Sequence, residues 1–289
     1  MNWLNSIHKS IDYIENHLEE NVTIDEIAKY ICISPFYFQK CFTILCGFTV
    51  GEYIRNRKLS LAGAELIHSN KKVIDIALKY GYDSPDSFTK AFTRFHGVTP
   101  TAVWKEGAMI KSFAPLKINV SLKGASLLNY KIMEKEAFSV IGISKLISYE
   151  DAEIEVPKLW KELYETGKNK IVTGMYGINM DKEMGTNEFE FMIADDSSDH
   201  QKINDGFQVK RIPKHTWAMF ACKGPAKEVL PEINKQIFTE WLPNCKEYEI
   251  AEGYNIESYS DPSNFLNGVE DKDYYCEIWI PIKKLEVIL

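Results

Sequence analysis

The sequence predicts an all-α N-terminal part with two helix-turn-helix units, followed by an α+β domain. Three observations predict this fold class. Apolar residues recur at helical spacing from the start of the chain, and one helical segment is written twice, about fifty residues apart. After a short irregular stretch, the pattern changes to alternating strands interrupted by two helices. Helices followed by a strand-rich region are typical of two separate domains.

The composition is that of a globular protein whose acidity lies in its C-terminal part. The 289 residues suffice for two domains, and 45% are hydrophobic and 26% charged. Residues 1–110 carry 12 Lys+Arg and 12 Asp+Glu, which leaves 22 against 29 in the remainder and gives a net charge of −7. A neutral N-terminal part can still present one basic face to nucleic acid.

The N-terminus and the cysteines predict a cytoplasmic protein without metal, disulfide or cofactor. The first residues alternate polar and apolar side chains, unlike a signal peptide, and no later run is long enough to span a membrane. The cysteines form no CxxC pair and lack histidines at zinc-finger spacing, so free thiols are expected. They are Cys32, Cys41, Cys46, Cys222, Cys245 and Cys276.

The first helical unit has clear start and stop signals. One apolar stripe runs through Leu4, Ile7, Ile11, Ile14 and Leu18 and predicts the opening helix. Thr23 followed by Glu26 predicts a capping box at the second helix. Ser34 and Pro35 predict the start of a third helix, which Gly47 ends.

The second unit copies the first. IDEIAKYICISPFYFQKCFTILCGFT corresponds to IDIALKYGYDSPDSFTKAFTRFHGVT, with Ser84 and Pro85 starting the last helix and Gly97 ending it. A long helix over residues 51–68 is expected between the copies. On this helix we expect one of Arg55, Arg57 and Lys58 to form a salt bridge, and phosphate contact by the others is left open.

Two such units on a rigid spacer suit duplex DNA, because successive major-groove openings on one face lie roughly 34 Å apart. The positions expected to be exposed are Ser34, Tyr37, Gln39, Lys40 and Thr43 in one unit and Ser84, Asp86, Ser87, Thr89, Lys90 and Arg94 in the other. Gln39 is suited to adenine, and Lys40, Lys90 and Arg94 to guanine or phosphate. The alternative is that these are ordinary solvated helix faces.

Residues 1–106 resemble the DNA-binding domain of the AraC family of regulators. The resemblance rests on YIRNRKLSLAGAEL, on IDIALKYGYDSPDSFTKAFTRFHGVTP and on the spacing of the units. It implies double-stranded DNA and RNA polymerase as partners, and base-facing roles for Phe36, Gln39, Lys40, Pro85, Asp86, Thr89 and Lys90. Asp86 departs from the amide of similar members; a carboxylate favours a cytosine amino group and repels phosphate.

The domains are expected at residues 1–108 and 127–289, joined by a linker over 109–126 that contains Gly, Pro and Ser. The C-terminal domain repeats the order strand, helix, strand, strand. The first copy comprises FSVIGIS, PKLWKELYETG, VTGMYGIN and FEFMIAD; the second comprises HTWAMFACKG, VLPEINKQIFTEWL, EGYNIESYS and YYCEIWIPI. Two such halves join their sheets about a pseudo-twofold axis, with helices on one face and a ligand cleft on the other.

Period-two counting assigns side chains to these faces. Cys276, Ile278, Ile280, Phe189, Phe191, Ile193 and Ile256 are predicted to face the helices. Tyr275, Glu277, Trp279, Glu190, Met192, Glu257 and Tyr259 are predicted to face the cleft. A carboxylate among aromatic rings favours a cationic partner, so Glu277 is the predicted centre of a ligand site. The alternative is a merely solvated face.

Residues 127–289 resemble a GyrI-like effector-binding domain, as found fused to AraC-type units in Rob-like and multidrug-responsive regulators. FQVKRIPKHTWAMFACKGP, IFTEWLPNC, YNIESY and YYCEIWIPIKK carry the resemblance. It implies that Glu277 lies in the ligand pocket, with Trp217, Tyr176 and Tyr259 as candidate lining residues.

Three functions stay open for this domain. The leading hypothesis is a regulator whose cleft binds a small amphipathic, possibly cationic effector and alters DNA binding. The second is a hydrolase of small electrophilic compounds, with Glu277 as acid or base, although no nucleophile with a paired base is visible. The third is a domain that docks a protein partner without any ligand.

Overall fold

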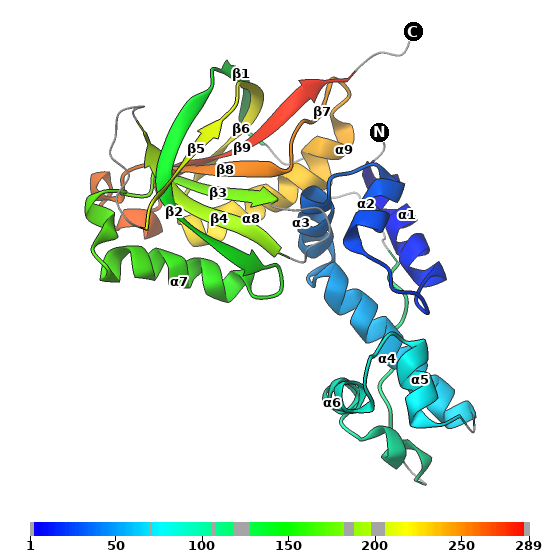
Figure 1. Ribbon diagram of the computed structural model, residues 1–289. Helices are drawn as coiled ribbons and strands as arrows, with labels where there is room; N and C mark the ends of the chain where they lie inside the picture. Colours follow the sequence, from blue (N-terminus) through cyan, green and yellow to red (C-terminus); the bar gives the residue numbers. More distant parts are fainter. Residues whose placement is uncertain are drawn as a thin grey trace. The chain divides into compact units, whose positions relative to one another are not determined.

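The computed structural model describes residues 3–69, 71–105, 108–117, 128–181, 188–197 and 206–285 (Figure 1). The chain packs as two compact units. The sheet unit contains Met1–Trp3, Ile33–Gly47 and Lys123–Leu289, and the helical unit contains Leu4–Cys32 and Phe48–Leu122. The domain boundaries expected near residues 108 and 127 divide the chain in sequence order, whereas these units group residues by contact, so the boundaries stay predictions. Residues 118–127 lie outside the described part.

The helical unit contains α1 (Trp3–Asn16), α2 (Ile24–Ile31), α4 (Val50–His68), α5 (Val73–Lys79), α6 (Pro85–His96) and the 3-10 helix η1 (Pro100–Trp104). The predicted caps are confirmed. Oγ1 of Thr23 accepts from the backbone N–H of Glu26 at 3.3 Å, and the Glu26 carboxylate accepts from the N–H of Thr23 at 2.9 Å. Ser84 caps α6, and Gly97 ends it with a φ of 82°.

Two features fix the helical unit around α4. Its buried apolar core is formed by Leu59, Ala62, Leu66, Ile76, Ala77, Tyr80, Phe88, Phe92 and Val103. The salt bridge expected on this helix is the one from Arg57 to Glu15, whose two oxygens lie 2.8 Å from Nε and Nη2. The start of the predicted linker is also bound here, because the N–H of Phe113 donates to Ser60 at 2.9 Å. None of the helices in the described ranges is long and apolar enough to cross a membrane.

Helix α3 (Pro35–Cys46) belongs to the sheet unit. It begins as predicted, with Ser34 as the N-cap accepting from the N–H of Tyr37, and it ends at Gly47 with a φ of 77°. The left-handed backbone at that position favours glycine.

The described residues of the sheet unit form one antiparallel sheet in the order β1-β6-β9-β8-β3-β4-β2-β5, with β7 paired to β9. The strands are β1 (Tyr130–Lys135), β2 (Phe138–Ser148), β3 (Tyr176–Asp181), β4 (Glu188–Asp196), β5 (Gln208–Ile212), β6 (His215–Lys223), β7 (Tyr248–Ile250), β8 (Tyr254–Tyr259) and β9 (Tyr275–Lys284). The order β2-β4-β3 on one side mirrors β6-β9-β8 on the other. The predicted pair of repeats is therefore joined where β3 meets β8.

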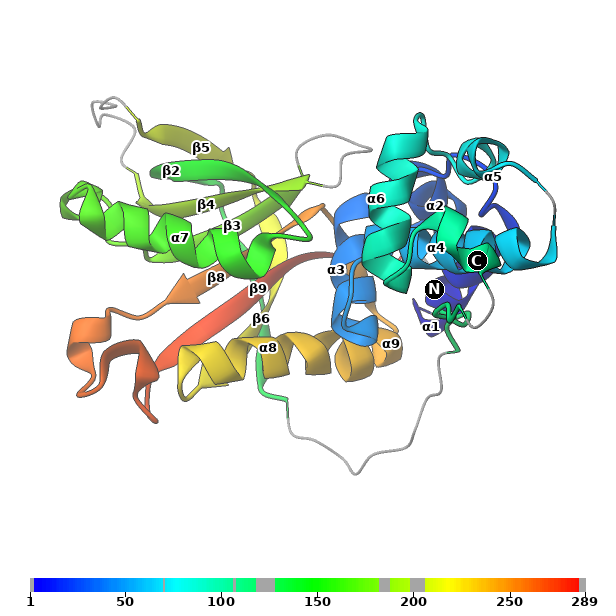
Figure 2. The same cartoon turned by 90° about the horizontal axis from the view of Figure 1, so that it is seen from below.

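The helices cover one face of this sheet (Figure 2). Helix α7 (Ala152–Glu165) packs through Leu159 and Leu163 on Phe189, Phe191 and Ile193, as the alternation predicted. The second helical run comprises α8 (Ala226–Gln236), a π-helical turn η3 (Ile237–Trp241) and α9 (Leu242–Asn244). Its Trp241 packs edge-on against Phe220 of β6, with ring centroids 4.9 Å apart.

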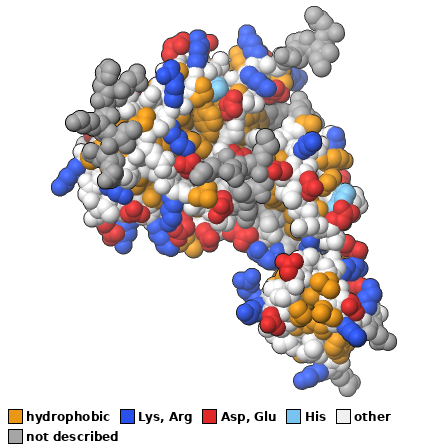
Figure 3. Space-filling view, in the orientation of Figure 1, with side chains coloured by type: hydrophobic (Ala, Val, Ile, Leu, Met, Phe, Trp, Pro, Cys, Tyr) orange, Lys and Arg blue, Asp and Glu red, His pale blue; other side chains and the backbone are white. Residues whose placement is uncertain are grey.

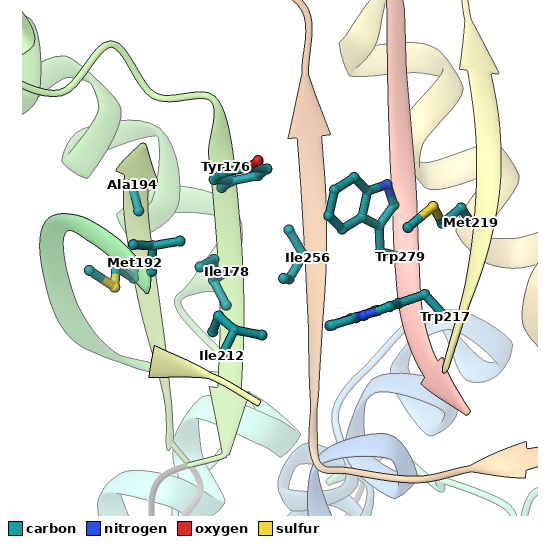
Figure 4. Packing of buried hydrophobic residues seen from close by; sticks show 10 residues of the cluster. Tyr176, Ile178, Met192, Ala194, Ile212, Trp217, Met219, Ile256 and Trp279 are labelled. Carbon is teal, nitrogen blue, oxygen red and sulfur yellow. The ribbon is translucent and has the colours of Figure 1, made fainter. Parts of the chain in front are cut away.

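The opposite face carries the second core of this unit, which we call the aromatic face (Figure 4). It consists of Val140, Tyr176, Ile178, Met192, Ala194, Ile212, Trp217, Met219, Ile256 and Trp279, with Phe138, Met180 and Tyr254 packed against it. These side chains alternate with the helix-facing ones along each strand.

Three strands were not predicted from the sequence: β1, β5 and β7. Strands β1 and β5 lie at the two ends of the sheet order, and β7 pairs only with the end of β9. None of the six side chains of β1 is buried, so the strand lacks a buried apolar face and its sequence lacks the alternation that marks one.

Candidate functional site

Helix α6 presents the residues predicted to read DNA in the second unit. Phe88 and Phe92 are fully buried and anchor one face of the helix, so the opposite face is left exposed. Pro85, Asp86, Lys90 and Arg94 are exposed and Thr89 is half-buried. Lys and Arg side chains lie on several sides of the helical unit in Figure 3, with Asp and Glu side chains among them. The helix can therefore offer these polar groups to a nucleic acid.

Helix α3 differs from its counterpart. Of its predicted base-facing residues, Phe36 and Gln39 are 1% and 2% exposed, and Lys40 is half-buried. The expectation that Gln39 and Tyr37 are exposed is wrong for this structure, because α3 packs on the sheet. Nζ of Lys40 donates to Oδ1 of Asn255 on β8 at 2.7 Å.

Two further hydrogen bonds hold the first turn of α3. The backbone N–H of Phe36 donates to the carboxylate of Asp181, at the end of β3, at 3.0 Å. The hydroxyl of Tyr37 donates to the backbone carbonyl of Tyr254 at 2.9 Å, and its ring lies 6.1 Å from that of Phe238. The helix is thus fixed at its N-terminus and along one side.

Glu277 lies on β9, on the face opposite the helices, as predicted. Its carboxylate accepts hydrogen bonds from Nζ of Lys131 at 2.8 Å, from the hydroxyl of Tyr275 at 2.7 Å and from Nε1 of Trp279 at 2.7 Å. Burial alone would raise its pKa, but these donors together lower it below the ordinary value. The carboxylate is therefore ionised at neutral pH and lies beside an indole ring.

Two more of the predicted lining residues lie against that ring. The centroid of Trp279 lies 5.8 Å from that of Tyr176 and 6.0 Å from that of Trp217. Nζ of Lys135 lies over the rings of Trp279 and Phe138, at 4.7 and 4.8 Å from their centroids. A cation of this protein thus occupies the place that was predicted for a cationic ligand.

Glu190, at the repeat position of Glu277, also lies on this side of the sheet. It is 7% exposed and accepts a hydrogen bond of 2.6 Å from Nζ of Lys210. Each of the two predicted carboxylates therefore has a lysine partner. Tyr275 is the most exposed of the predicted lining residues, at 40%.

The predicted faces of β8 are wrong. Ile256 pairs with Trp279 and belongs to the aromatic face, because the register shifts the strand by one residue from the predicted phase. Tyr259 lies on the helix side, where its ring meets that of Trp160 on α7 at 5.5 Å and its hydroxyl donates to Glu257. Neither Tyr259 nor Glu257 lines the aromatic face.

The sequence reasoning missed the lysines of this site and Tyr254. Lys131 and Lys135 alternate with Ile132 and Glu134 on β1, so period-two counting would have found them if β1 had been recognised. Tyr254 packs against Trp217, with centroids 5.9 Å apart. No hydrogen-bond partner among the described residues serves the buried Nε1 of Trp217, Nε2 of His215 or the hydroxyl of Tyr254.

Comparison with known proteins gives two family matches. The model of the integron-associated effector binding protein matches residues 131–282, and the model of a helix-turn-helix domain matches residues 27–106. Together they cover most of the described chain.

Individual relatives match one or both regions. The HTH-type transcriptional activator AarP of Providencia stuartii is 38% identical over 33% of this chain and 70% of that protein. The Right origin-binding protein of Escherichia coli K12 is 23% identical over 94% of this chain and 96% of that protein. The HTH-type transcriptional regulator YbfP of Bacillus subtilis is 35% identical over 34% of this chain, and the chain spans only 33% of the length of that protein. A solved protein bound to tetraphenylphosphonium overlaps 54% of this chain and 94% of its own, at 15% identity and a TM-score of 0.45.

Proposed function

We propose a ligand and DNA-reading residues for this chain, which belongs to the AraC family of DNA-binding transcription regulators and carries an effector-binding domain of the integron-associated type. The proposed effector is a small amphipathic molecule with a cationic group, bound at the aromatic face. The proposed DNA readers are α3 and α6, each of which would enter one of two adjacent major-groove segments. RNA polymerase as a further partner and a cytosolic location are part of the same proposal.

The observation that carries the effector proposal is the ionised Glu277 carboxylate bonded to the indole of Trp279. A cation between this carboxylate and the aromatic rings gains from both. Its competitors are Lys135, whose Nζ lies 4.7 Å from the ring centroid of Trp279, and Lys131, whose side chain is 51% exposed. The carboxylate side chain is only 13% exposed, but water already solvates the ammonium group of Lys131, so a ligand cation can displace this lysine at small cost. The buried Nε1 of Trp217 has no acceptor among the described residues, which supports a ligand that also carries an oxygen or nitrogen.

Tryptophan fluorescence tests this proposal. Wild type, Glu277→Gln and the control Glu134→Gln are titrated with an aromatic phosphonium cation and with a neutral aromatic molecule of similar size. Glu134 lies on the other side of β1 and pairs with Lys214, so its removal changes the net charge equally. The proposal expects saturable quenching by the cation, with an affinity that is at least about tenfold lower in Glu277→Gln alone. Equal binding by all three proteins contradicts it.

A protein-docking domain without ligand is the second candidate. It is favoured by one observation: Trp217 and Trp279 are 0% and 6% exposed, so an effector must displace neighbouring side chains to reach them. Absence of quenching by every ligand of the titration would favour this candidate.

We propose that Glu277 does not serve as a general acid. A general acid at neutral pH needs a raised pKa, whereas the donors around Glu277 lower its pKa. Turnover of an electrophilic compound that is lost in Glu277→Gln would overturn this part of the proposal.

A further inference from the structure

We propose that the sheet end formed by Asp181, Tyr254 and Asn255 is a docking surface for α3, and that docking there and DNA binding by α3 exclude each other. The inference rests on the proposed DNA-reading role of α3. The contacts within the sheet unit engage the same groups of the helix that a duplex would need.

The first such group is the N-terminus of α3. Backbone N–H groups at a helix N-terminus bind anions, and DNA-reading helices use them on phosphates. In this structure the anion is the Asp181 carboxylate, 3.0 Å from the nitrogen of Phe36. Asp181 therefore takes the place of a phosphate oxygen, and the two cannot be bound there together.

The second group is the ammonium of Lys40, which is predicted to contact a base. A guanine offers such a donor its carbonyl oxygen, and here Oδ1 of Asn255 offers an amide oxygen at 2.7 Å. Tyr37 closes the contact, since its hydroxyl bonds the carbonyl of Tyr254. The dock thus matches α3 in charge and in hydrogen bonding.

Some buried hydrogen-bond donors at this docking surface have no acceptor among the described residues, which suits a contact that must open. Nε2 of Gln39 and Nδ2 of Asn255 are buried without a hydrogen-bond partner among the described residues. Buried donors without acceptors disfavour a contact. An adenine edge would satisfy the amide of Gln39, so the duplex offers a bond that the sheet does not.

The same surface adjoins the candidate effector site. Tyr254 bonds α3 through its backbone carbonyl, while its ring packs on Trp217 and His215, with centroids 5.9 and 5.8 Å away. A ligand that moves Trp217 therefore acts on a residue that holds α3. Through this residue, occupancy of the aromatic face would change the release of α3.

A reversible cross-link tests the proposal in the full chain. A Cβ atom at Gly253 would lie 3.9 Å from Cβ of Phe36, within the range of a disulfide. The double variant Phe36→Cys with Gly253→Cys is prepared oxidised and reduced, and mass spectrometry verifies the bond. Binding is measured to a duplex that the wild-type chain enriches from a random-sequence library. The two single variants, treated with the same oxidant, control for the native cysteines.

The proposal expects the bond to form, duplex affinity to fall at least about tenfold on oxidation, and reduction to restore it. Failure of the bond to form, or equal affinity of the two forms, would overturn the docking inference while the proposed function stands. If wild type enriches no duplex at all, the proposed function fails and the inference fails with it.

A second variant avoids the substitution of buried Phe36. Asp181→Asn removes the competing anion and is expected to tighten duplex binding about threefold to tenfold. Asp273→Asn, an exposed position that pairs with Lys223, makes the same charge change away from the dock and controls for long-range repulsion of phosphate. Equal affinities of the two variants would overturn the proposal.

Discussion

The carboxylate of Glu277 accepts a hydrogen bond of 2.7 Å from the indole nitrogen of Trp279, two residues further along the same strand. Alternation puts both side chains on one side of β9, and the bond orients the indole with its polar edge toward the carboxylate. The ring is left to pack on Tyr176 and Trp217. Charge and aromatic surface are thus offered to a ligand from adjoining positions.

Removing the lysine that neutralises Glu277 is expected to improve ligand binding. In Lys131→Gln, an aromatic cation no longer competes with an ammonium group bound 2.8 Å from the carboxylate. Because the pair is half-exposed, the expected gain in affinity is about twofold to fivefold. Titration calorimetry checks it, with Lys214→Gln as the control that removes a lysine paired, within the described part of the chain, with Glu134 and Glu136. Unchanged or weaker binding in Lys131→Gln would show that Lys131 is no competitor.

The exposed face of α6 leads to a prediction on DNA binding. Lys90→Ala is expected to weaken binding to an enriched duplex and, if Lys90 meets phosphate, to reduce the slope of affinity against salt by about 1, uniformly across sequences. If Lys90 reads a base, specificity is instead relaxed at one position. Filter binding over a salt series and a set of single-base duplexes separates the two. Lys161→Ala, exposed on α7, should leave both quantities unchanged.

The sheet contains a glycine that its fold requires. A Cβ atom at Gly142 of β2 would lie 2.0 Å from the backbone oxygen of Ile193 on β4, closer than any real contact. Gly142→Ala must therefore separate two paired strands, and we expect it to lower the free energy of unfolding by more than about 2 kcal/mol. Urea denaturation checks this, and Ser139→Ala on the same strand should cost far less. A neutral effect of Gly142→Ala would mean that the strands pair otherwise.

Local signals predicted the elements that depend on local chemistry. Ser34 with Pro35 and Ser84 with Pro85 start α3 and α6, because a capping hydroxyl and a proline fixed at a helical φ act within one turn. The repeated strand order also predicted the symmetric sheet. These features need no knowledge of distant contacts.

What could not be predicted depends on pairing between distant segments. In β8, Ile256 and Tyr259 are both apolar enough for either side, and only the pairing of Ile256 with Trp279 decides the faces. Gln39 and Lys40 are polar and occur on exposed helix faces as a rule, so their packing against the sheet has no periodic signal. The edge strand β1, with Lys131 and Lys135, likewise lacks an apolar pattern.

His96 leads to the last prediction, a loss of stability in acid. The ring is 4% exposed: Nε2 lies 2.9 Å from the carbonyl of Leu59 and Nδ1 accepts from the N–H of Lys111 at 3.1 Å, which requires the neutral form. Burial lowers its pKa, partly offset by the bond to Leu59. The unfolded chain, with a histidine pKa of about 6.5, therefore takes up a proton at a higher pH than the folded chain.

The stability that depends on neutral His96 is thus fully present above about pH 6.5 and is lost as the pH falls through the lowered value of the folded state. We expect the amides of α4 and α6 to lose hydrogen-exchange protection between pH 7.5 and 5.5, after correction for the intrinsic exchange rate, and to lose less in His96→Gln. His68→Gln, at the exposed end of α4, should behave as wild type. His96 is the only histidine that is buried in the described core of this unit. If His96→Gln and wild type lost protection equally in acid, groups other than His96 would be responsible for the loss of stability.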